Sequence, residues 1–207
     1  MEPVLERVLD QLPSDDAAAQ VGWQDAATIV LRALQQVQAD TALSLGYSPG
    51  DLEFTVSLAI LGERSIGLVQ VGDGCIVVEQ DGKIEAGTLR QAGEYAGETW
   101  FIGPGDEALQ RANTSLRPAA GLTAVLAITD GVAHRWLHAK NSEPAPGVQR
   151  LVERLRDGEW SEGNLRAHLE QTWWHGLGDD DRSVAYLVNS GSPSQVDDDE
   201  DREVNME

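Results

Sequence analysis

Apolar residues occupy every second position in the middle of the chain, which favours β-strands there. This period of two is typical of a strand that buries one face. Continuous apolar runs follow at 66–71, 75–78 and 122–128, and an Asp81-Gly82 pair predicts a hairpin turn after the second of them. The middle of the chain is therefore expected to form an antiparallel sheet. The alternating positions are Leu52, Phe54, Val56, Leu58 and Ile60.

Helical spacing of apolar residues flanks this region on both sides. A short helix is expected from Pro3 to near Pro13, and a longer one after Ser14 or Asp15. Two more helices are predicted at 148–156 and 163–173, before a last strand at 183–188. This order contains no βαβ alternation, so residues 1–189 are predicted to form one layered α+β domain. The apolar positions of the long helix are Val21, Ile29, Val30, Ala33, Leu34 and Val37.

The net negative charge of the chain restricts the classes of molecule that it can bind. Its 35 acidic residues outnumber 15 basic ones and give a net charge of -20, which repels nucleic acid and anionic membranes. Part of the excess lies in Asp197-Asp198-Asp199-Glu200-Asp201. Residues 190–207 are therefore predicted to be a disordered acidic tail, and a docking tail for a basic partner is the alternative.

The N-terminus does not read as a signal peptide, and no apolar run reaches the ~20 residues that span a bilayer. The single cysteine, Cys75, allows no intramolecular disulfide, and its apolar strand predicts a buried, inert thiol. A cytoplasmic location is therefore expected.

Three aspartates stand at the ends of apolar strands. Asp73 and Asp130 follow a strand, and Asp180 precedes the last one. Carboxylates that meet at one sheet edge offer the oxygen ligands that Mg²⁺ and Mn²⁺ favour. Aspartate also caps loops at strand ends, so composition alone leaves both interpretations open. Asp81 and Asp157, in polar surroundings, are interpreted as turn residues.

Four short motifs give the chain a resemblance to a known family. They are Gly72-Asp73-Gly74, Gly93 to Thr99, Thr129-Asp130-Gly131 and Asp179-Asp180-Asp181, in that order. The chain resembles the bacterial branch of the PPM family, the metal-dependent, 2C-like serine/threonine protein phosphatases, over about residues 1–189. The resemblance implies an α-β-β-α sandwich, with two antiparallel sheets between layers of helices.

The resemblance also implies roles for single residues. Asp130 and Asp180 would coordinate a pair of Mn²⁺ or Mg²⁺ ions, and Asp73 would match the ligand of a more weakly held third metal. Thr129, Gly131, Gly74 and Asp181 would support this site. In the family, the metal pair holds a water that attacks the phosphorus of phosphoserine or phosphothreonine. A phosphoprotein or a kinase is the partner that this activity implies.

The chain departs from the family pattern at its beginning. Family members open with a β-hairpin that carries Gln-Asp and Asp-Gly, whereas this chain starts within the helix that should follow. Gln24-Asp25-Ala26 has a matching pair but lies in a helical pattern, so it is interpreted as a decoy. The sandwich is thus expected to be N-terminally truncated, with exposed sheet edges.

Three explanations stay open for this departure: a start upstream of Met1, a fragment, or a pseudophosphatase completed by a partner. The predicted function is a phosphatase domain that is active if completed. The alternative is an inactive regulatory or interaction module, whose incomplete sheet is covered by a second chain or by self-association.

Histidine and tryptophan add two smaller expectations. His134 and His138 are four residues apart, as in some zinc sites, but no third ligand is in view and both are interpreted as ordinary helix residues. Trp100, Trp136, Trp173 and Trp174 are expected to pack in the core.

Overall fold

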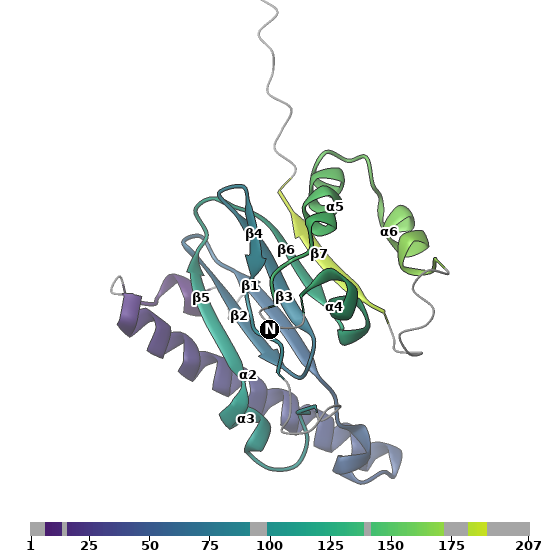
Figure 1. Ribbon diagram of the computed structural model, residues 1–207. Helices are drawn as coiled ribbons and strands as arrows, with labels where there is room; N and C mark the ends of the chain where they lie inside the picture. The colour runs from purple at the N-terminus through teal and green to yellow at the C-terminus, as the bar shows by residue number, and fades with distance from the viewer. Residues whose placement is uncertain (1–6, 14–15, 92–98, 139–141, 172–181, 190–207) are drawn as a thin grey trace, which may run out of the picture.

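The computed structural model describes residues 7–13, 16–91, 99–138, 142–171 and 182–189. In this part of the chain two antiparallel sheets stack between helices (Figure 1). One sheet has the order β1-β2-β5 and the other β4-β3-β6-β7. The strands are β1 (Val56–Leu61), β2 (Ser65–Val71), β3 (Cys75–Gln80), β4 (Lys83–Ala86), β5 (Asn113–Pro118), β6 (Leu122–Ile128) and β7 (Val184–Val188).

Helices cover the outer face of each sheet. The long helix α2 (Asp16–Leu45) lies across β1-β2-β5, whereas α4 (Asp130–Trp136), α5 (Pro146–Arg156) and α6 (Glu162–Leu169) lie on the side of the other sheet (Figure 1). The short element η1 (Pro49–Leu52) contacts α2, and the short helix α3 (Glu107–Arg111) contacts α2 and β2. The predicted α+β fold with an α-β-β-α order of layers is confirmed.

Buried apolar side chains of the described residues form a core at each interface between layers. Ile66, Leu68, Ile76, Val78 and Val125 pack between the two sheets. A second cluster joins α2 to the outer face of β1 and β2, and a third joins β3 and β6 to α4, α5 and α6. Strands β2, β3 and β6 bury both faces, which explains why they are continuous apolar runs in the sequence.

The buried face of α2 differs from the predicted one. Val21, Ile29 and Val37 were expected to face the core, but their side chains are 57%, 70% and 57% exposed. The helix instead packs through small residues around one large ring, because alanines let its backbone approach the sheet. Its buried residues are Ala19, Trp23, Ala27, Leu31, Gln38 and Ala42.

Other element boundaries also depart from the prediction. Strand β1 starts at Val56, because residues 49–52 form η1 and Phe54 makes only an isolated bridge to Ile102. Strand β5 and helix α3 had no clear apolar period and were not predicted. The Asp81-Gly82 hairpin is confirmed, with φ of 52° and 74° at its two residues.

An ion pair ties helix α5 to the four-stranded sheet. Glu79 on β3 is 1% exposed, and its Oε2 lies 2.7 Å from Nη1 of Arg156 at the end of α5. The Thr123 hydroxyl of β6 donates to the same oxygen at 2.6 Å. Loss of the Arg156 partner would leave the buried Glu79 charge uncompensated and would strongly destabilise the fold. The ion pair therefore holds the end of α5 against the four-stranded sheet.

None of the described helices is long and apolar enough to cross a membrane. The predicted acidic tail, residues 190–207, lies outside the described residues, and so do Trp173 and Trp174.

The contact between Trp23 and Gly67 allows a test of the α2 layer. The Trp23 ring is fully buried, its Nε1 donates to the Leu68 carbonyl at 3.2 Å, and a Cβ on Gly67 would lie 2.5 Å from the ring. We expect Gly67→Ala to lower the free energy of unfolding by about 1–3 kcal/mol through overpacking, measured by urea denaturation. Gly50→Ala, which meets no atom within 4 Å, is the control. Equal stability of both variants would contradict this packing.

Candidate functional site

Strand pairing brings two of the predicted aspartates to the same edge of the four-stranded sheet. Cys75 at the start of β3 pairs with Ile128 at the end of β6, and Ile128 also pairs with Val184 at the start of β7. Asp73 lies two residues before Cys75 and Asp130 two residues after Ile128. Both residues therefore lie at the same end of the four-stranded sheet.

The loop that carries Asp73 is held tightly against the sheet. Gly72 has a φ of 107°, which favours glycine, and a Cβ on Gly74 would lie 2.7 Å from the Ile128 carbonyl oxygen. The Thr99 hydroxyl donates to Oδ2 of Asp73 at 2.6 Å, so this carboxylate is oriented by a neighbour. The glycines thus let the loop pass close to β6, and Thr99 aims the side chain.

The segment after β4 completes this loop. Gln91 accepts a hydrogen bond from the Gly72 N–H at 2.8 Å and fixes the loop backbone. Arg90 donates from Nε to the Asp73 carbonyl at 3.1 Å, and its Nη2 lies 3.5 Å from Nε2 of His134 on α4. A half-buried guanidinium therefore stands between the Asp73 loop and α4.

Asp130 is the first residue of α4, directly after Thr129. Backbone and side chain of Thr129 bond to the start of the last strand: its N–H donates to the Ser183 carbonyl at 3.1 Å, and its Oγ1 accepts from the Ser183 N–H at 3.0 Å. An acidic residue in the first turn also suits the helix dipole, which is a purely structural role for Asp130. The Thr129 contacts fix where α4 begins relative to β7.

The third predicted ligand, Asp180, is not placed by the structure. Asp180 and Asp181 lie outside the described residues, and Gly131 follows Asp130 within α4. Among the described residues, no three histidine, cysteine, aspartate or glutamate side chains form a group that could hold a metal ion. Asp73 and Asp130 together supply carboxylate oxygens, the donor chemistry of Mg²⁺ and Mn²⁺, so the residues that are placed fit part of such a site.

The histidines, the cysteine and two of the tryptophans can be compared with their predicted environments. Helix α4 ends at Trp136, so His138 lies beyond it and does not share a helical face with His134, contrary to the predicted spacing. Cys75 is buried, as predicted, and burial raises the pKa of its thiol to about 11, which disfavours the reactive thiolate. Trp136 packs in the core as expected, and Trp100 is partly buried, with the Arg111 guanidinium 4.0 Å from its ring centroid.

Arg90, Gln91 and Thr99 were not predicted as site residues. Thr99 ends a segment that the family resemblance had marked, so a signal existed for it. No local pattern marks Arg90 and Gln91, because their role arises only when the chain returns from β4 to the Asp73 loop.

A cleft separates the free edges of the two sheets. Within the described part of the chain, β1 pairs only with β2 and β7 only with β6. The cleft between them measures about 530 Å³, and its walls combine apolar side chains from both sheets. It is lined by Ser57, Leu58, Ala59, Ile60, Leu61, Ile66, Val125, Ala127, Ala185, Tyr186 and Leu187.

Solved structures of bacterial phosphatases share this fold. A bacterial serine phosphatase matches with 14% identity and a TM-score of 0.51 over 88% of this chain and 73% of its own. The serine/threonine phosphatase Stp1 from Staphylococcus aureus matches with 15% identity and a TM-score of 0.50 over 83% of this chain and 66% of its own. In another match, a variant bacterial serine phosphatase with a TM-score of 0.43, this chain covers 52% of that chain.

Sequence comparison gives the family directly. Curated protein sequences yield no significant match. The family model described as Protein phosphatase 2C, however, matches residues 4–172, which is more than half of the chain and includes the Asp73 and Asp130 motifs. The chain therefore belongs to the protein phosphatase 2C family.

Proposed function

We propose that this chain is a metal-dependent phosphatase domain that hydrolyses phosphoserine or phosphothreonine in proteins once its open sheet edges are covered. The observation that carries the proposal is the register of β3, β6 and β7, which delivers Asp73 and Asp130 to one sheet edge. Membership of the protein phosphatase 2C family supplies the reaction class. A cytoplasmic setting and a phosphoprotein or kinase partner remain part of this proposal.

Asp73, Asp130 and Asp180 would hold Mn²⁺ or Mg²⁺ at this edge. Such ions neutralise phosphoryl charge and activate water for attack on phosphorus. The residues of the chain orient this site: Thr99 fixes the Asp73 carboxylate through its 2.6 Å hydrogen bond, and Thr129 fixes the start of α4, where Asp130 stands. Glycine at positions 72 and 74 keeps the backbone close to the sheet.

Arg90 has a place in the same proposal. Its guanidinium stands between the Asp73 loop and His134. A planar guanidinium is suited to bind two phosphate oxygens at once. Arg90 is therefore proposed to contact the phosphoryl group, the role that the family gives to an arginine of its first hairpin.

Metal binding and turnover test this function. Wild-type protein is titrated with Mn²⁺ by calorimetry, and p-nitrophenyl phosphate hydrolysis is measured in parallel. Asp130→Asn should reduce turnover by more than about a hundredfold, since loss of even an outer-shell partner of a metal costs ~10–100-fold. Asp81→Asn is the control, because it removes a carboxylate from a hairpin residue whose φ of 52° asparagine tolerates.

The titration and the turnover assay distinguish three outcomes. Mn²⁺ binding with turnover that depends on Asp130 and not on Asp81 supports the proposal. Equal losses in both variants contradict the site. Absent or millimolar binding without turnover rejects hydrolysis by this chain alone.

The open cleft favours a second candidate function, a pseudophosphatase that acts as an interaction module. Unpaired strand edges flanked by apolar side chains are templates for another chain. Val56 of β1 and Val184 of β7 both lie at the end of the sandwich where Asp73 and Asp130 emerge. A second chain, or a second copy of this one, that paired with β1 and β7 would both cover the cleft and reach the carboxylates.

Self-association through the cleft is tested by sedimentation velocity over a range of concentrations. Leu187 on β7 lines the cleft and is 56% exposed, so Leu187→Lys should shift the protein toward monomer by placing a charge at the free edge. Leu43→Lys changes a similarly exposed leucine, 65%, on α2 and should leave association unchanged. A wild-type protein that stays monomeric at all concentrations would exclude a second copy as the covering chain.

A further inference from the structure

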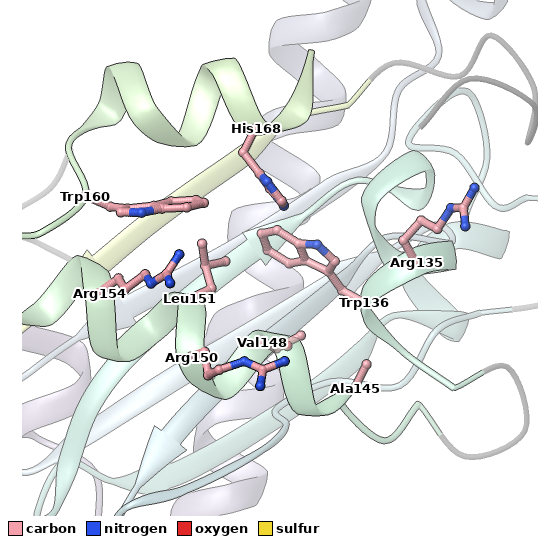
Figure 2. Close-up of a pocket in the computed structure, with 10 residues that line it drawn as sticks. Arg135, Trp136, Ala145, Val148, Arg150, Leu151, Arg154, Trp160 and His168 are labelled. Carbon is pink, nitrogen blue, oxygen red and sulfur yellow. The ribbon is translucent and has the colours of Figure 1, made fainter. Parts of the chain in front are cut away.

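A separate pocket opens between α4, α5 and α6, beyond the outer face of the four-stranded sheet. It measures about 290 Å³, and its walls mix aromatic rings with arginines (Figure 2). No aspartate or glutamate is among the residues that line it, although acidic residues outnumber basic ones by 35 to 15 in the chain. The pocket is lined by Arg135, Trp136, Ala145, Gly147, Val148, Arg150, Leu151, Arg154, Trp160 and His168.

Three rings form the apolar part of the pocket. Trp136 of α4, Trp160 of the α5–α6 connection and His168 of α6 point toward the space around Leu151 (Figure 2). The Trp160 and His168 ring centroids are 5.2 Å apart. Burial first, and the charge of Arg154 second, lower the pKa of His168, which disfavours the charged form of this ring. The rings can therefore hold the aliphatic or aromatic part of a ligand.

Two arginines of α5 supply positive charge at the rim. Arg150 and Arg154 are exposed and one helical turn apart, and the side chain of Arg150 makes no hydrogen bond or ion pair with another described residue. Arg154 lies 5.5 Å from the Trp160 ring centroid, and its Nε is 3.9 Å from the exposed carboxylate of Glu159, which is a weak pair. Like charges at this spacing destabilise a helix slightly. The contacts of Arg154 with Trp160 and Glu159 offset part of this cost, whereas no described side-chain contact does so for Arg150.

We propose that this pocket docks a phosphorylated segment of a protein substrate, with the phosphoryl group on Arg150 and Arg154 and a neighbouring side chain among the rings. A volume near 300 Å³ is at the small end for a free ligand and suits one or two side chains of a peptide. Arginine pairs bind phosphate oxygens through charge-assisted hydrogen bonds. The assignment of the segment to a substrate rests on the proposed phosphatase function.

Helix α4 connects the pocket to the carboxylate edge. Its first residue is Asp130 and its last is Trp136, so the two sites are separated by about 10 Å along this helix. An extended peptide covers about 3.3–3.6 Å per residue. A segment of some ten residues can therefore occupy the pocket with one phosphorylated residue while it presents another to the edge.

Peptide binding without turnover tests the pocket by itself. A fluorescein-labelled ten-residue phosphoserine peptide and its unphosphorylated twin are titrated in EDTA, and binding is followed by anisotropy and by tryptophan fluorescence. Arg150→Gln combined with Arg154→Gln should weaken phosphopeptide binding by roughly tenfold or more. Arg32→Gln combined with Lys83→Gln removes two exposed charges elsewhere and should leave binding unchanged. Far-ultraviolet circular dichroism and the thermal midpoint should show that both double variants are folded.

Each result decides between this pocket and the sheet edge. Binding that survives Asp130→Asn and is lost with the arginines supports the pocket, whether or not the chain turns over substrate. Binding that is lost with Asp130→Asn and survives without the arginines places the peptide at the edge and overturns the pocket proposal. Equal binding of the unphosphorylated twin, or tighter binding of adenosine monophosphate than of the peptide, would also overturn it.

Discussion

The backbone pairing of β3 with β6 is the contact on which the other features depend. Its register sets Cys75 opposite Ile128, and both strands bury one face against β2 and the other against α4 and α5. A shift by one residue would turn every side chain of β3 to the opposite face, so both cores select the same register. That register in turn fixes where the chain leaves the sheet, and hence where Asp73 and Asp130 stand. The positions of Asp73 and Asp130 are therefore a consequence of core packing.

The elements that could be predicted from sequence are those whose own residue pattern reflects their burial or their turn conformation. Strands β2, β3 and β6 bury both faces and read as apolar runs, and the Asp81-Gly82 turn carries its own conformational signal. Helix α2 was predicted, but its buried face was not, because the packing depends on alanines around Trp23 that fit the groove above Gly67. Strand β5, Asn-Thr-Ser-Leu-Arg-Pro, has no apolar alternation and forms because β2 offers it an edge. In the candidate site, the motif aspartates stood out in sequence, whereas Arg90 and Gln91 act through contacts across the fold.

The free strand edges and the two motif aspartates lie at the same end of the sandwich. The free edges of β1 and β7 border one cleft, and the same end of the sandwich carries the two carboxylates. Backbone groups at an open edge gain from pairing with another strand, and the Asp73 and Asp130 carboxylates would gain from bound cations. A polypeptide that added strands there would pair with the free edges. Its strand ends would lie beside Asp73 and Asp130, so the same binding event could complete the site. Coverage of the cleft and completion of the site are thus expected to be coupled.

Electrostatics then decides how an acidic chain could recognise a phosphorylated partner. A net charge of -20 repels such a partner at long range. At physiological ionic strength, however, charges separated by more than about 8 Å are largely screened. Recognition must therefore come from short-range cations, and the described arginines supply them at two places: Arg90 beside the carboxylate edge, and Arg150 with Arg154 at the pocket rim. If both places bind phosphoryl groups, added salt should have opposing effects. It should relieve the long-range repulsion and speed association, while it weakens the local contacts and speeds dissociation. A phosphopeptide would then show a shallower salt dependence of its affinity than either rate constant shows alone.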